Sequence, residues 1–134
     1  MKSNIKIKKI NNDIVSIIID EPKTYNALSF KNLNDLIKIF KQLDKDNKIK
    51  VIILEGAGKG FSAGHNLKEV RSLKKKEKYQ KLFSLCSKLM LQIVEGRKPV
   101  IAKVHGAAYA AGCQLAASCD LAYSTKDALF ATPG

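Results

Sequence analysis

The sequence predicts an α/β domain built from repeated strand–strand–helix units. Apolar runs of strand length, rich in β-branched residues, recur at residues 14–20, 50–55 and 99–104, and polar or glycine-rich residues end each of them. Between the runs lie longer stretches whose apolar residues follow helical spacing. A chain of 134 residues is long enough for a core of its own, and no linker divides it, so we expect a single domain over residues 1–134.

The elements follow in order along the chain. Residues 5–10 alternate isoleucine with lysine, which predicts an edge strand with one solvated face, and residues 14–20 predict a buried strand. Ser29 is a suitable N-cap for a helix whose apolar positions continue to Leu43. The prediction is completed by a strand over 50–55, a basic helical stretch from Leu67, an amphipathic helix over 81–95, a strand over 99–104, a small-residue loop over 106–112, a short helix over 114–118 and a strand over 121–123.

The positive net charge of +12 allows two interpretations. Clustered cations bind the phosphates of nucleic acids or anionic membranes. Only Arg71 and Arg97 are arginines, however, and the lysines are spread along the whole chain. Since nucleic-acid-binding proteins usually rely on arginine as well, a solvated lysine-rich surface is favoured over a nucleic-acid-binding domain.

The three cysteines, Cys86, Cys113 and Cys119, form no C-x-x-C pair, which predicts reduced thiols and no disulfide framework or zinc site. We expect neither a metal nor a cofactor of the protein's own. No apolar run approaches the roughly 18 residues that span a bilayer. Residues 1–9 lack the apolar core of a secretory signal, so the expected location is cytoplasmic.

Two loops that each lead from a strand to a helix form the candidate site. The first is glycine-rich over residues 56–60 and runs into residues 61–67; the second, over 106–112, consists mostly of small residues. One backbone N–H from each loop could meet on a carbonyl oxygen and form an oxyanion hole. Small residues serve equally well to let a helix pack closely, and on the residues alone both interpretations stay open.

These motifs resemble the crotonase superfamily, the enoyl-CoA hydratases and isomerases. The resemblance covers essentially the whole chain, and its motifs are Asn26-Ala27-Leu28, FSAGHNLKE over 61–69, KPVIA over 98–102 and AAGCQLA over 110–116. It implies a crotonase-like spiral of ββα units and an acyl-CoA substrate in fatty-acid or lipid metabolism. It also implies lyase or isomerase chemistry if the protein is active, and a homotrimer or hexamer at full length.

The resemblance also implies roles for single residues. The backbone N–H groups of His65 and Ala111 would bind the thioester oxygen and stabilise an enolate. Gln114 would orient a water, and the His65 imidazole is a further candidate for catalysis. Residues implied to line the coenzyme A site are Lys23, Thr24, Tyr25, Ala27, Ala63, Gly64, Asn66, Leu67 and Lys68.

The sequence departs from the family pattern in two respects. Hydratases of the family activate water with two glutamates, whose positions are matched here by Gln114 and Gly134, and neither residue accepts a proton near neutral pH. Glu69, Asp120 and Tyr109 could replace them, although roles as helix charge, structural cap and pocket wall explain these three residues better. Family members are also longer, so we expect the C-terminal part of the fold to be missing and an apolar edge to be exposed.

Whether the protein is an enzyme is left open by the sequence. The leading hypothesis is an acyl-CoA-binding protein that stabilises a thioester enolate. The alternatives are a non-catalytic acyl-CoA-binding regulatory protein and a basic nucleic-acid-binding domain. Two other interpretations of the glycine-rich turn fail, because Gly60 follows Lys59 where a P-loop needs Ser or Thr, and Phe61 breaks the spacing of a dinucleotide fingerprint.

Overall fold

Five strands form the main sheet, in the order β1-β2-β3-β4-β6. The computed structural model describes residues 2–133. β1 (Ile5–Lys9) is antiparallel to β2 (Ile14–Ile19). β3 (Val51–Gly56), β4 (Val100–Val104) and β6 (Leu121–Ser124) continue the sheet in parallel. Parallel neighbours need crossover connections, which the helices between these strands provide.

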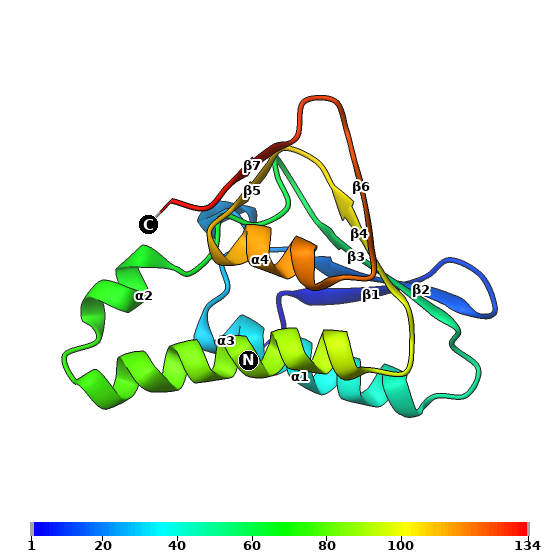
Figure 1. The fold of residues 1–134 in the computed structure, drawn as a ribbon, viewed down its shortest axis with the longest axis horizontal. Helices are drawn as coiled ribbons and strands as arrows, with labels where there is room; N and C mark the ends of the chain where they lie inside the picture. Colours follow the sequence, from blue (N-terminus) through cyan, green and yellow to red (C-terminus); the bar gives the residue numbers. More distant parts are fainter. Residues whose placement is uncertain (1, 134) are drawn as a thin grey trace.

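Helices α1 (Phe30–Lys45) and α3 (Lys76–Glu95) run side by side along one side of the sheet (Figure 1). α1 begins where predicted, and its cap is the Ser29 hydroxyl, which accepts a hydrogen bond from the Asn32 N–H at 3.1 Å. α3 begins at Lys76, earlier than the predicted residue 81. Lysine and glutamate are good helix formers, but they add no apolar periodicity, so the pattern alone missed the first turn.

The core lies between the sheet and these helices. Ile17, Ile19 and Leu54 of the central strands are fully buried, which confirms the buried strand expected over 14–20. On β1 only Ile5 is buried, whereas the side chain of Ile7 is 51% exposed. β1 lies at the end of the sheet order, which confirms the predicted edge strand, but its isoleucines are not buried along the whole strand.

A second, two-stranded sheet pairs β5 (Ala107–Tyr109) with β7 (Leu129–Ala131) in parallel. The prediction of a loop over 106–112 was wrong at these positions, and β7 was not predicted. Strands of this length show no alternation that a sequence pattern could reveal. β5 pairs with β7 on one side and with the segment before His65 on the other, where the N–H groups of Phe61 and Ser62 both donate to the Ala107 carbonyl.

Two short helices complete the fold: α2 (Leu67–Ser72) and α4 (Ala111–Ser118). α4 begins at Ala111, three residues before the helix predicted from 114, so the small-residue motif runs directly into its first turn. In residues 2–133 no helix is long and apolar enough to cross a membrane. An apolar edge is exposed on β6 and β7, where the large side chains of Leu121, Tyr123, Leu129 and Phe130 are each about half exposed or more.

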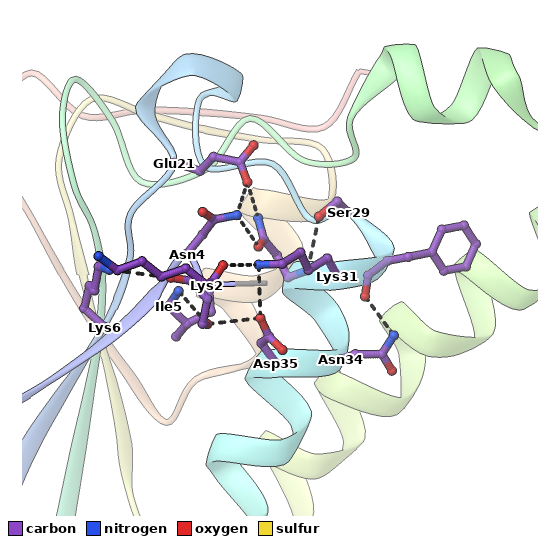
Figure 2. Close-up of polar contacts among 12 residues, drawn as sticks. Lys2, Asn4, Ile5, Lys6, Glu21, Ser29, Lys31, Asn34 and Asp35 are labelled. Carbon is purple, nitrogen blue, oxygen red and sulfur yellow. Dashed lines mark hydrogen bonds and ion pairs between the residues drawn. The ribbon is translucent and has the colours of Figure 1, made fainter.

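Glu21 fixes the loop that follows β2 to the start of α1. Its Oε1 accepts hydrogen bonds from the side-chain amides of Asn4 at 2.6 Å and Asn32 at 3.1 Å, as Figure 2 shows. Its Oε2 accepts one from the Thr24 hydroxyl at 2.7 Å. All these partners are neutral donors, so the carboxylate serves to position residues 21–24, which form one wall of the candidate site.

Candidate functional site

A cavity of about 290 Å³ lies between the loop after β2 and the start of α2. Its lining residues are Lys23, Thr24, Tyr25, Ala63, His65, Asn66, Leu67 and Lys68. The structure thus brings together most of the residues that the resemblance implies for the coenzyme A site. Ala27 and Gly64 are buried and are not among the lining residues. Asn66 also has a structural role, because its side-chain oxygen caps α2 by accepting from the N–H groups of Lys68 and Glu69.

The second loop pairs through its backbone with the segment that leads into this cavity, although none of residues 106–112 is among the lining residues. Ser62 forms a parallel bridge with Ala108, and the Tyr109 N–H donates to the Ser62 carbonyl at 3.0 Å. Two residues later, Gly64 has φ +95° and faces the start of α4. A Cβ built on Gly64 would lie 3.2 Å from the Ala111 nitrogen. The two predicted N–H donors, on His65 and Ala111, are therefore carried by segments that touch.

The turn before α4 aims the Ala111 N–H by means of a strained residue. Ala110 has φ 51° and ψ −120°, a conformation that residues other than glycine rarely adopt. Its own N–H donates to the Ala131 carbonyl of β7 at 2.8 Å, which helps to hold it in place. Among residues 2–133, neither the His65 N–H nor the Ala111 N–H donates to a protein acceptor. Ala111 is 8% exposed and is the first residue of α4, where the backbone N–H has no partner within the helix and is free for another acceptor.

Asn26 holds the first loop against the cavity. It is buried with φ 55°, and its Nδ2 donates to the carbonyl oxygens of Ala57, Gly60 and Phe61 at 2.8–3.2 Å. The main-chain carbonyl oxygen of Asn26 accepts a hydrogen bond from the Ser62 hydroxyl at 2.8 Å. One side chain thus fixes both ends of the glycine-rich turn. Asn26 was not among the predicted site residues, although its place in the Asn26-Ala27-Leu28 motif was a signal for a structural role.

The His65 ring is held on two sides. Its Nδ1 lies 3.1 Å from the Leu28 carbonyl oxygen. Its ring meets the ring of Phe83, on α3, edge to face at a centroid distance of 5.4 Å. In turn, the Leu28 N–H donates to the Gly64 carbonyl at 2.8 Å, so the backbone on both sides of the imidazole is tied together. Phe83 was not singled out by sequence reasoning, because a half-exposed aromatic on a helix carries no site signal.

The remaining candidates have structural partners or lie apart. Glu69 Oε1 accepts from the Phe30 N–H at 3.0 Å and so caps α1, and Asp120 Oδ2 accepts from the Val100 N–H at 2.8 Å. Tyr109 belongs to β5, and its backbone N–H binds the Ser62 carbonyl. Gln114 is exposed on α4. Gly134, the second position matched to a family glutamate, lies outside the described residues.

The cysteines are free thiols, as expected from their spacing. Burial raises the pKa of Cys86. Burial, and to a lesser degree the charge of Asp120, raises the pKa of Cys119 to about 12. Neither thiol is therefore a ready nucleophile. Within residues 2–133 no group of three His, Cys, Asp or Glu side chains is arranged to hold a metal ion.

Comparison with known proteins gives a consistent picture. A family model described as Enoyl-CoA hydratase/isomerase matches residues 9–134. The chain is 43% identical over 121 residues to human enoyl-CoA hydratase domain-containing protein 3, mitochondrial, covering 90% of this chain and 40% of that protein. A crystal structure of the same human protein matches with a TM-score of 0.93 and 39% identity, over 98% of this chain and 52% of that chain. An enoyl-CoA hydratase structure from Mycobacterium smegmatis matches with a TM-score of 0.93 and 42% identity, over 96% and 50%.

These matches confirm the resemblance and the crotonase-like fold class. They include the likeness to enoyl-CoA hydratase domain-containing protein 3, which the sequence carries in Ser118-Cys119-Asp120 and in residues 130–134. The chain spans about 40% of the length of enoyl-CoA hydratase domain-containing protein 3 from human and Xenopus laevis, and about half of the two solved chains. The expectation of a partial fold agrees with this coverage.

Proposed function

The chain belongs to the enoyl-CoA hydratase/isomerase family, and from this premise we propose that it binds an acyl-CoA thioester. The thioester oxygen lies between the backbone N–H groups of His65 and Ala111. The cavity of about 290 Å³, which His65 lines, holds only the part of the acyl-CoA next to the thioester. The observation that carries the proposal is the Ala111 N–H, which has no protein acceptor among residues 2–133, belongs to a residue that is 8% exposed, and has its nitrogen 3.2 Å from where a Cβ on Gly64 would lie.

The chemistry that follows is enolate stabilisation. When a proton leaves the carbon next to a thioester, negative charge develops on the thioester oxygen. Two N–H groups already aimed at that position stabilise the charge without reorganising, and one such donor contributes about 3 kcal/mol in enzymes where it has been removed. The strained turn at Ala110 supports this role, because strain of this kind concentrates where backbone groups are held for function.

Two lysines support an anionic ligand. Lys23 and Lys68 line the cavity from opposite segments, the loop after β2 and the first turn of α2. Both side chains are exposed at its rim, where they can pair with phosphate groups while the thioester end reaches the two N–H groups. The net charge of the chain, +12, adds general attraction for a polyanion such as coenzyme A.

A non-catalytic acyl-CoA-binding protein is the second candidate. One observation favours it: no carboxylate lines the 290 Å³ cavity among residues 2–133, and the exposed Gln114 is not a proton acceptor near neutral pH. Such a protein would keep the two N–H donors and raise its melting temperature with acyl-CoA, yet form no product. Product formation from an enoyl-CoA separates the two candidates.

The experiment compares two ligands of equal chain length, an acyl-CoA thioester and an alkyl-CoA thioether that lacks the carbonyl. Two added hydrogen bonds at about 0.5–1.5 kcal/mol each predict that the thioester binds about 5- to 150-fold more tightly by calorimetry. Ala111→Pro removes one of the two N–H groups, at the first position of α4, where proline is tolerated. We expect this variant to bind the thioester and the thioether with more similar affinities than the unmodified protein does. Equal affinity of the two ligands for the unmodified protein would refute the proposal.

Location and assembly stay predictions. We propose a cytoplasmic protein on the basis of its reduced cysteines; the relatives whose names include "mitochondrial" are described so for themselves. A homotrimer or hexamer at full length is proposed from the family resemblance. The exposed apolar side chains of β6 and β7 support association, since large apolar patches are usually covered in solution. Cell fractionation and light scattering test the two proposals.

A further inference from the structure

We propose that the imidazole of His65 is the base that takes a proton from the carbon next to the thioester, through its Nε2 atom. The inference rests on the proposed function, because it needs the thioester oxygen to lie at the His65 and Ala111 N–H groups. It goes further in assigning a proton-transfer group and therefore an isomerisation or exchange reaction. Both the backbone and the side chain of His65 would then act on the same substrate.

The first support is the tautomer that the structure requires. A carbonyl oxygen only accepts hydrogen bonds, so the Nδ1 atom, 3.1 Å from the Leu28 carbonyl, carries the hydrogen. In the neutral ring, Nε2 then has a free lone pair. Among residues 2–133 no protein group binds Nε2. Histidines that act as general bases commonly donate a hydrogen bond from one ring nitrogen to an acceptor, which orients the ring, and take the proton on the other nitrogen.

The second support is that the ring is held in place within the cavity wall. Phe83 meets it edge to face at 5.4 Å, from α3, while Leu28 binds it from the loop before α1. His65 is one of the residues that line the 290 Å³ cavity. A ring fixed from two elements loses less orientation freedom when it reacts than one on a mobile loop.

The third support comes from elimination of the other titratable groups. The cavity is lined by Lys23, Tyr25 and Lys68 besides His65, and ammonium groups and phenols do not accept protons near neutral pH. The nearest carboxylates in sequence are already engaged: Glu21 with Asn4, Asn32 and Thr24, and Glu69 with the Phe30 N–H. Within the described residues, the His65 imidazole is the one lining side chain that offers a ring nitrogen lone pair to a proton.

The step balances without an oxidant, a reductant or a cofactor. The Nε2 lone pair forms a bond to the hydrogen, the carbon–hydrogen bond breaks, and its electron pair becomes the enolate. The charge on the thioester oxygen is held by the two N–H groups, and the imidazolium carries the positive charge. Return of a proton to the same carbon, after the imidazolium has exchanged its proton with water, gives exchange with solvent. In a 3-enoyl-CoA, loss of the proton next to the thioester gives a dienolate, and return of the proton to the far carbon of the dienolate moves the double bond next to the thioester.

The experiment follows deuterium uptake at the carbon next to the thioester. The protein as its source makes it is incubated with a saturated acyl-CoA in D₂O, and the recovered acyl-CoA is examined by mass spectrometry. His65→Asn keeps an N–H that can reach the Leu28 carbonyl, but it has no basic nitrogen. We expect uptake with the unmodified protein and a rate at least about 100-fold lower with the variant, the usual contribution of a general base.

The matched control is His105→Asn, which changes the other histidine. His105 binds the Gly58 carbonyl through Nε2 at 2.6 Å and is not among the residues that line the cavity, so uptake should stay unchanged. A second variant, His65→Ala, leaves a space that added imidazole can enter, and recovery of uptake with imidazole supports the inference even if His65→Asn binds poorly. If His65→Ala is folded and still prefers the thioester, but added imidazole does not restore deuterium uptake, the inference is overturned.

The outcomes separate this inference from the proposed function. Uptake that persists in His65→Asn places the base elsewhere and overturns the inference. Preferential thioester binding with no uptake in the unmodified protein also overturns it, but leaves the oxyanion proposal standing and favours the non-catalytic candidate. Loss of the thioester preference itself contradicts the proposed function, whatever the uptake shows.

Discussion

A side chain on Gly64 would fill the space in front of the Ala111 amide. Its Cβ would lie 3.2 Å from the Ala111 nitrogen and 3.1 Å from the Tyr109 carbonyl oxygen, closer than side-chain atoms normally approach. The relation joins the segment after β3 to the first residue of α4. The glycine leaves the space beside the Ala111 nitrogen free of a side chain, as the proposed site requires.

Gly64→Ala should therefore abolish the thioester preference. The positive φ of 95° adds a backbone cost of about 1–2 kcal/mol, so the variant will also be less stable. Gly58→Ala is the matched control: its φ is 78°, and its Cβ would meet Pro22 at 3.0 Å, but Gly58 does not line the 290 Å³ cavity. We expect urea titration to show a similar loss of stability in both variants. We expect calorimetry to show loss of the preference for the thioester over the thioether in Gly64→Ala alone. Equal binding by the two variants would contradict the role of Gly64.

Asn26→Ala should destabilise the protein by about 3 kcal/mol, because three carbonyl oxygens lose their donor in a buried site. The control is Asn34→Ala. That exposed side chain donates only to the Phe30 carbonyl at 2.9 Å, a contact drawn in Figure 2, and its loss should cost under about 0.5 kcal/mol. Chemical unfolding measures both. A cost for Asn26→Ala as small as that of the control would show that the turn is held by other contacts.

Ala110→Gly should stabilise the protein by about 1 kcal/mol, since glycine adopts φ 51° without strain and the relief exceeds the entropy that glycine adds to the unfolded chain. The same change at Ala117, exposed on α4, removes a helix former and should cost about 1 kcal/mol. The free energy of unfolding should thus rise in one Ala→Gly variant and fall in the other, which attributes the difference to the positive φ at Ala110. A loss of stability in Ala110→Gly would mean that the turn is not strained.

The pKa of Cys119 predicts a loss of stability at high pH. In the unfolded chain the thiol ionises near its ordinary pKa of 9.0, whereas burial and Asp120 raise the pKa in the fold to about 12. The thiol's contribution is complete below pH 9 and falls as pH rises from 9 to about 12, because only the unfolded state then releases the proton. We measure how much the free energy of unfolding falls between pH 8 and pH 10 in the unmodified protein and in Cys119→Ala. The fall should be about 1 kcal/mol larger in the unmodified protein. Parallel pH profiles for the two proteins would contradict the raised pKa.

Much of this fold could be predicted from local patterns. The Ser29 cap and the helical spacing of Leu33, Leu36 and Phe40 predicted α1, and three apolar runs predicted the parallel strands. These features have strong local causes. Strands β5 and β7 have none, because each exists only through its partner and through the pairing of β5 with Ser62.

Some features of the candidate site could likewise be predicted from the sequence, and others could not. The motifs predicted which loops would carry the two N–H groups, and the cavity gathers most of the expected lining residues. The motifs could not predict that Ala110 would adopt a positive φ or that Phe83 would meet the His65 ring. Both features depend on contacts between segments far apart in the sequence, which spacing along one chain does not encode.

The most direct test of the central claim is the infrared frequency of the thioester carbonyl. An acyl-CoA labelled with ¹³C at that carbonyl is measured free in water and bound to the protein, and the unlabelled spectrum is subtracted. Hydrogen bonds from the His65 and Ala111 N–H groups in a dry site polarise the carbonyl more strongly than water does, so the bound band should move to lower wavenumber. A bound band at or above the frequency in water would contradict the claim that these two groups bind the thioester oxygen.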